Sequence, residues 1–163
     1  MFDNGLITLA ETFLQRCSAG RVKLATAESC TGGLLAGLLT EIPGASDVFE
    51  RGFITYSNQS KIDLLHVAPA HLEKHGAVSD IVAQAMAQGL IRNTSCDLGI
   101  AITGIAGPDG GTSEKPVGLV YIAVARRGQG ALAEQCRFSG TRSTIRLEAI
   151  RASLDLALRE FLA

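Results

Sequence analysis

A serine followed by small residues ends an apolar stretch near the N-terminus, in the sequence Ala-Glu-Ser-Cys-Thr-Gly-Gly over residues 27–33. Residues 22–27 predict a short buried strand, so we expect the Ser29 hydroxyl to emerge at an edge of a sheet. Glycines there let a substrate approach the backbone. A serine in this setting can act as a nucleophile, while neighbouring amides stabilise an oxyanion. The candidate substrate contacts are Cys30, Thr31, Gly32 and Gly33.

The same segment also has a purely structural interpretation. Helical spacing resumes at Leu34, and either Ser29 or Thr31 can cap the first amides of that helix. The segment lacks the G-x-S-x-G pattern of a nucleophile elbow, so an α/β-hydrolase finds no support. Spacing alone leaves capping and catalysis both open.

A serine nucleophile needs a base, and the sequence offers a lysine more readily than a histidine. The three histidines, His66, His71 and His75, lie in a polar stretch away from the predicted strand ends, where we expect a solvated surface. Lys61 follows Tyr56 closely, and both side chains can converge at the mouth of the sheet. A lysine acts as a base when desolvation or a neighbouring cation lowers its pKa. The alternative is an ordinary solvated lysine on a helix.

Two further segments have the composition of anion sites. The glycine-rich stretch 103–111 follows a predicted strand and can hold a phosphate with its amides, although it lacks the lysine and serine of a Walker motif. A mobile connector is the alternative. Arg142 and Arg146 lie one turn apart at the start of the last helix, where one anion can meet both guanidinium groups. An exposed helix face is the alternative there.

The elements that position these residues alternate between helices and strands. Helical spacing predicts helices over residues 4–19, from residue 34, over 59–65, after Ser79 and after Thr141, with a brief turn between Pro69 and Gly76. Strands are expected over residues 22–27, 53–56, 98–103 and 117–125, with a hairpin through Gly128 and Gly130 to a strand ending near Phe138. The hairpin forces an antiparallel pair, so a mixed sheet covered by helices follows.

Composition limits the class of protein. The 163 residues are 47% hydrophobic, which suits one domain over residues 1–163, and the formal charge of −1 argues against a nucleic-acid partner. No apolar stretch approaches the ~20 residues of a membrane span, so no membrane partner is expected. Four scattered cysteines without a CxxC pair argue against zinc and suit a reducing cytoplasm. A small-molecule substrate and a symmetric homo-oligomer are expected.

Taken together and in order, the motifs resemble the CinA C-terminal domain family over nearly the whole chain. They are residues 26–33, Tyr56-Ser57-Asn58 with Lys61, residues 103–108, and Lys115-Pro116-Val117-Gly118. The resemblance implies an α/β/α sandwich that deamidates nicotinamide mononucleotide to nicotinic acid mononucleotide and ammonia, without a metal or another cofactor. Larger CinA proteins carry an additional N-terminal domain, and this chain looks like the stand-alone form.

The resemblance also implies roles for individual residues. Ser29 matches the family nucleophile, Lys61 the base, and Tyr56 the tyrosine that completes the polar network. Lys61 must be neutral to accept a proton, so we predict a lowered pKa. A nucleotide-binding module without turnover and a competence- or damage-linked interaction protein are the alternatives. The implied substrate contacts are Thr103, Gly104, Ala106, Gly107 and, for the phosphate, Arg142, with Arg146 one turn further along the helix.

Overall fold

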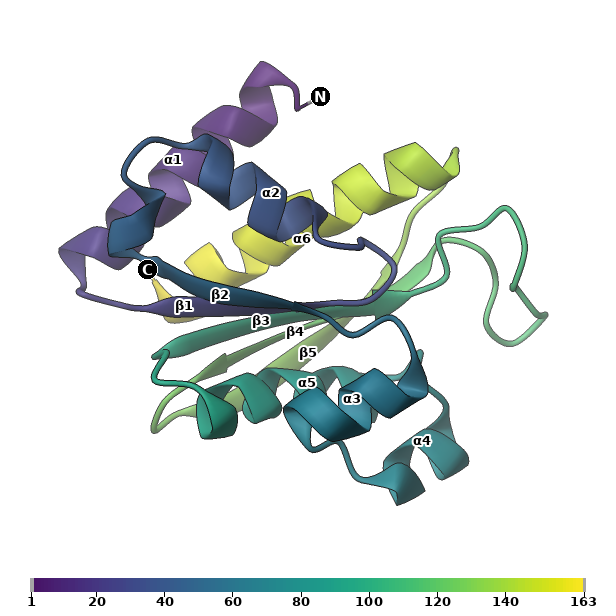
Figure 1. The fold of residues 1–163 in the computed structure, drawn as a ribbon. Helices are drawn as coiled ribbons and strands as arrows, with labels where there is room; N and C mark the ends of the chain where they lie inside the picture. Colours follow the sequence, from purple (N-terminus) through teal and green to yellow (C-terminus); the bar gives the residue numbers. More distant parts are fainter. Residues whose placement is uncertain (1, 163) are drawn as a thin grey trace.

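The structure, a computed structural model, describes residues 2–162 and has a mixed five-stranded sheet at its centre (Figure 1). The strand order is β2-β1-β3-β4-β5, in which β1 pairs in parallel with β2 and β3, while β3–β4 and β4–β5 are antiparallel. The predicted mixed sheet is therefore confirmed. The strands are β1 (Leu24–Glu28), β2 (Phe49–Ile54), β3 (Leu98–Gly104), β4 (Leu119–Arg126) and β5 (Gly130–Arg137).

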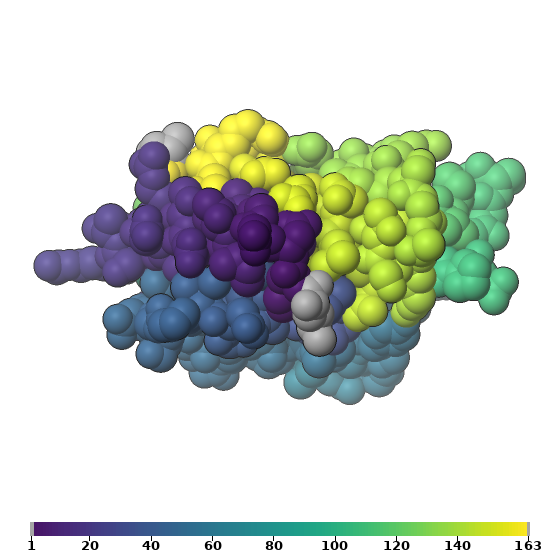
Figure 2. Space-filling model, turned by 90° about the horizontal axis from the view of Figure 1, so that it is seen from above, coloured from purple at the N-terminus to yellow at the C-terminus, as the bar shows by residue number. Residues whose placement is uncertain are grey.

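Helices cover both faces of the sheet and complete a three-layer α/β/α sandwich (Figure 1). One face carries α1 (Asn4–Ala19), α2 (Leu34–Glu41) and α6 (Arg142–Phe161), and the other carries α3 (Asn58–Leu65), α4 (Pro69–His75) and α5 (Asp80–Asn93). A 3-10 turn, η1 (Ala45–Asp47), leads into β2. Seen from above, α1 and α6 lie side by side, and the glycine-rich segment after β3 projects beyond them (Figure 2).

The two faces of the central strands differ in side-chain size. Leu24, Ile100 and Ile102 point to the core beneath α1, α2 and α6, whereas Ala27 and Ala101 point to the core beneath α3–α5. This split follows the two-residue period of a strand. The alanine face allows α5 to pack close to the sheet.

The expected helix starts after Ser79 and after Thr141 are confirmed, and α3 begins one residue before the predicted residue 59. The hydroxyls of Ser57, Ser79 and Thr141 accept hydrogen bonds from amides in the first turns of α3, α5 and α6. The prediction of a strand over residues 53–56 is wrong, because β2 begins at Phe49 and ends at Ile54. Its first half contains Glu50, Arg51 and Gly52 at a sheet edge, where solvent access removes the need for an apolar run.

The parallel pairing brings three chain segments together at one edge of the sheet. Glu28, the last residue of β1, is in register with Ile54, the last residue of β2, and with Ile102, two residues before the end of β3. Ser29 and Thr55, which follow β1 and β2, therefore meet the last residues of β3, among them Thr103. Ligands of open α/β sheets bind at this edge.

Candidate active site

A buried serine–lysine pair occupies the carboxyl edge of the sheet. The amino group of Lys61 lies 3.1 Å from the hydroxyl oxygen of Ser29 and donates a hydrogen bond of 2.6 Å to the carbonyl of Thr55. The Ser29 amide is fixed to the carbonyl of Ile102, and the Thr55 amide to that of Glu28. Lys61 projects from the first turns of α3, and both partners of its amino group are held by the sheet itself.

Burial prepares Lys61 for proton transfer. Only 1% of its surface is exposed, so the solvated alternative is wrong. Desolvation lowers the pKa of Lys61 to about 8, as predicted. One pH unit below such a pKa leaves about a tenth of the amine neutral, so a useful fraction of Lys61 can accept a proton near pH 7. The neighbouring cation that the sequence reasoning allowed is not needed to account for this shift.

The turn after Ser29 is capped by a residue that sequence reasoning overlooked. The Glu28 carboxylate, 1% exposed, accepts hydrogen bonds from the amides of Gly33, Leu35 and Ala36 at 3.2, 3.0 and 2.9 Å. These donors belong to the first turn of α2, whose N-cap, Gly33, offers no side chain. The capping interpretation of Ser29 and Thr31 is therefore wrong, since the Glu28 carboxylate caps α2. The Ser29 hydroxyl instead contacts the amino group of Lys61.

This capping also narrows the choice of oxyanion donors. The Gly33 amide is bound to Glu28, and the Gly32 amide donates to the carbonyl of Ser29 at 3.0 Å. Among the residues described, the amides of Cys30 and Thr31 donate to no other residue. Of these two, Cys30 lines the cavity beside Ser29.

A cavity of about 280 Å³ opens over the serine–lysine pair. It collects several of the expected contacts and some that were not foreseen, while Thr31, Gly32, Gly33 and Arg146 do not line it. The residues expected individually in its wall are Ser29, Cys30, Tyr56, Lys61, Thr103, Gly104, Ala106, Gly107 and Arg142. Ile105, Asp109 and Gly110 belong to the glycine-rich stretch predicted as an anion site, and Ala77 and Val78 were not foreseen.

Two of the expected residues hold the walls of the cavity together. Arg142 donates to the carbonyl of Gly107 at 2.8 Å and to the hydroxyl of Tyr56 at 3.0 Å, which joins α6 to both neighbouring loops. The Thr103 hydroxyl donates to the carbonyl of Ala77 at 2.9 Å. Tyr56 is thus connected to Arg142 rather than directly to Ser29 or Lys61. It remains 60% exposed at the cavity mouth.

The other reactive side chains are unsuited to nucleophilic or metal chemistry here. Burial raises the pKa of the Cys30 thiol to about 11, so the residue beside Ser29 stays protonated at neutral pH. None of the three histidines lines the cavity, in agreement with the expectation for them. Within residues 2–162, His, Cys, Asp and Glu form no group of three that could hold a metal ion.

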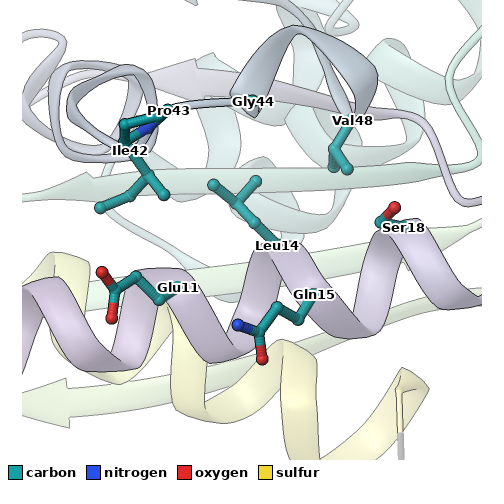
Figure 3. Close-up of a pocket in the computed structure, with 8 residues that line it drawn as sticks. All are labelled: Glu11, Leu14, Gln15, Ser18, Ile42, Pro43, Gly44 and Val48. Carbon is teal, nitrogen blue, oxygen red and sulfur yellow. The ribbon is translucent and has the colours of Figure 1, made fainter.

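A second hollow lies on the far side of the molecule, between α1 and the segment that leads into η1 (Figure 3). Its volume is about 340 Å³, larger than that of the cavity over Ser29. Its lining contains no lysine, arginine or histidine, and no residue within 2–162 forms a hydrogen bond with the hydroxyl of Ser18. The smaller cavity is therefore the candidate active site because of its serine–lysine pair and not because of its volume. The lining residues are Glu11, Leu14, Gln15, Ser18, Ile42, Pro43, Gly44 and Val48.

Fold and site together define an α/β/α domain with a buried serine–lysine pair under a glycine-rich loop. Residues 6–161 match the CinA C-terminal domain, and the chain belongs to that family. It is 44% identical to the nicotinamide-nucleotide amidohydrolase PncC of Escherichia coli K12, covering 99% of this chain and 98% of the relative. The PncC of Enterobacter agglomerans is 48% identical over 83% of each chain.

A solved structure agrees with this assignment. The crystal structure of the competence/damage inducible protein CihA from Agrobacterium tumefaciens has a TM-score of 0.95 and 41% identity, covering 98% of this chain and 97% of that one. Other relatives are longer. The chain spans 33% of a competence-damage inducible protein from Acetivibrio thermocellus, to which it is 50% identical. In the part of the chain described here, no helix is long and apolar enough to cross a membrane.

Proposed function

We propose that this protein hydrolyses the carboxamide of nicotinamide mononucleotide to give nicotinic acid mononucleotide and ammonia. The observation that carries the proposal is the contact of 3.1 Å between Ser29 and a buried lysine whose pKa lies at about 8. Two relatives, from E. coli and E. agglomerans, are named nicotinamide-nucleotide amidohydrolases, and this chain aligns with most of the length of each. Their names support this substrate class.

In the proposed first step, the Ser29 oxygen attacks the carboxamide carbon and its proton passes to the neutral amine of Lys61. The oxyanion that forms accepts a hydrogen bond from the Cys30 amide. One such donor contributes about 3–4 kcal/mol in known cases. When the C–N bond breaks, Lys61 returns the proton to the leaving nitrogen, which departs as ammonia and leaves an ester on Ser29.

The second step reverses the proton movements with water as the nucleophile. Lys61 takes a proton from the attacking water, the ester bond breaks, and the Ser29 oxygen recovers its proton. An aromatic carboxamide is a poor electrophile, so this covalent route divides a difficult hydrolysis into two easier steps.

The rest of the cavity suits the nucleotide portion of this substrate. Arg142 supplies a guanidinium group at the mouth, where a phosphate can reach it. The glycine-rich segment from Gly104 to Gly110 brings backbone close to the cavity, so a ribose or phosphate can contact amides directly. We therefore assign the phosphate to the Arg142 side of the cavity and the carboxamide to the Ser29 side.

An ammonia-release assay across three substrates tests the proposed function. We expect wild-type protein to release ammonia from nicotinamide mononucleotide, and to do so much more slowly from nicotinamide riboside, which lacks the phosphate. NAD, whose phosphate carries a second nucleotide, shows whether the cavity mouth tolerates an extension. Binding of the mononucleotide without ammonia would instead support a nucleotide-binding module and overturn the proposal.

A further inference from the structure

Arg146 reaches the turn after Ser29 from behind, on the side of the sheet covered by α6. Its Nη2 donates a hydrogen bond of 2.7 Å to the carbonyl of Thr31. Its Nε is buried and has no partner among the described residues. Arg146 lies outside the cavity lining, whereas Arg142, one turn earlier, lies within it. The two arginines of α6 thus do different things, although their spacing suggested one shared anion.

The Thr31 carbonyl belongs to a peptide unit that is held at both ends. Its carbonyl accepts from Arg146, and its N–H, that of Gly32, donates to the carbonyl of Ser29 at 3.0 Å. The Ser29 carbonyl in turn shares a rigid, planar peptide unit with the N–H of Cys30. One continuous series of hydrogen bonds therefore runs from the Arg146 guanidinium to the peptide that carries the candidate oxyanion donor.

The backbone at Gly32 is shaped for this approach. Its φ of +60° lies in the left-handed region, which favours glycine. A Cβ atom there would stand 3.3 Å from Nη2 of Arg146, so a side chain would crowd the guanidinium. Glycine at this position both allows the turn and leaves room for the arginine.

We propose that Arg146 is a positioning residue that orients the Cys30 amide as the oxyanion donor for Ser29. The positive guanidinium polarises the Thr31–Gly32 peptide, and hydrogen bonds in series strengthen one another. Arg146 acts on the transition state through the backbone and does not touch the substrate. The substrate in this role comes from the proposed amidase function, whereas the hydrogen bonds that carry it are those of the structure itself.

Arg146→Ala tests the role, with Arg151→Ala as the matched control on the same helix. Arg151 pairs with Asp3 at 3.1 Å, away from the cavity. We expect Arg146→Ala to lower kcat by about 30-fold or more, a substantial part of the ~10²–10³-fold cost of losing one oxyanion donor. The Kd for nicotinamide mononucleotide, measured in a Ser29→Ala background, should change less than about threefold, because an oxyanion donor acts on the transition state. Arg151→Ala should retain the wild-type kcat.

Two further measurements separate positioning from simple loss of packing. Added guanidinium ion should restore part of the lost kcat in Arg146→Ala, and Arg146→Lys should be intermediate because it keeps one donor for Thr31. A kcat of Arg146→Ala within about threefold of wild type would overturn the proposal. Weaker substrate binding with an unchanged kcat would also overturn it, because that result would indicate that Arg146 contacts the phosphate.

A serine-directed fluorophosphonate makes the test independent of the natural substrate, because its phosphoryl oxygen occupies the same oxyanion site. We expect Ser29 to be labelled in wild type and much more slowly in Arg146→Ala. Labelling without ammonia release from the mononucleotide would reject the proposed function and keep the role of Arg146. Equal labelling of both proteins, or none of wild type, would reject the role of Arg146.

Discussion

Two lysines near the cavity show how the surroundings decide what a side chain does. The amino group of Lys115 donates to the carbonyl of His75 at 2.6 Å and fastens the glycine-rich loop to the end of α4. Lys61 makes a similar bond to Thr55, but it is buried and also meets a hydroxyl. Burial lowers the pKa of Lys61 to about 8, which suits its proposed role as the base. The sequence shows two lysines, and only the fold separates their roles.

The pH dependence of the reaction follows from the Lys61 pKa. The neutral amine is the reactive form, so kcat/KM should rise about tenfold per pH unit below pH 8 and level off above it. Initial rates of ammonia release between pH 6.5 and 9 measure this profile. A flat profile across that range would contradict the assignment of Lys61 as the base.

Removing the amine gives the matching mutational test. Lys61→Met keeps the length and apolar character of the buried stem, and it should lower kcat by about 10²–10⁴-fold, the usual contribution of a general base. Lys74→Met on the exposed surface of α4 is the control and should leave kcat unchanged. Circular dichroism of both variants should match wild type, which would assign the loss to chemistry.

At the scale of elements, the short helix α2 depends on Glu28, the residue just before the proposed nucleophile Ser29. Glu28→Gln would remove the negative charge and place an amide NH₂ among the three N–H donors that Glu28 now satisfies. We expect the free energy of unfolding to fall by about 1.5–3 kcal/mol, the range for hydrogen bonds to charged groups. Glu41→Gln at the exposed end of α2 should change it by less than about 0.5 kcal/mol, as surface substitutions usually do. Urea unfolding of both variants tests this, and equal stabilities would contradict it.

The close packing of α5 against α3 gives a second prediction for the elements. A Cβ on Gly89 would stand 2.2 Å from the carbonyl oxygen of Leu65, a contact that backbone cannot relieve locally. Gly89→Ala should therefore destabilise the fold by about 1–3 kcal/mol, the usual range for overpacking. A Cβ on Gly37 of α2 would have no atom within 4 Å. Gly37→Ala should therefore stabilise the fold by about 0.5–1 kcal/mol, because alanine has the higher helix propensity. Opposite shifts in Tm are expected, and shifts of the same sign would contradict the packing argument.

At the scale of the whole molecule, the sequence predicts the order and type of the helices and strands better than it predicts which side chains meet in the candidate site. Alternating elements and the hairpin were enough to predict a mixed, helix-covered sheet, and Ser79 and Thr141 marked two helix starts through the local rules of capping. The contacts of Lys61 with Ser29, and of Arg146 with Thr31, join residues 32 and 115 positions apart. No local pattern encodes such contacts. Spacing placed Arg142 and Arg146 on one helix face, but it could not show that one faces the cavity and the other the back of the turn.

Because the site joins segments from the whole chain, ligand binding should stabilise the entire fold. In Ser29→Ala, where turnover is blocked, nicotinamide mononucleotide at about 100 times its Kd should add about 2.7 kcal/mol of stability. For a chain of this size that corresponds to a rise in Tm of roughly 5–10 °C. Nicotinamide riboside at the same concentration should give a smaller rise, because it lacks the phosphate assigned to Arg142. Equal rises for both ligands would contradict that assignment.

The central claim is that Ser29 is the nucleophile of an amidase, and the rate of ammonia release by Ser29→Ala tests it most directly. With nicotinamide mononucleotide in excess, we predict that this variant loses at least about 10³-fold in kcat, in line with the loss of a catalytic serine elsewhere. It should still bind the substrate and keep the wild-type fold. Ammonia release by Ser29→Ala at a rate near that of wild type would contradict the account.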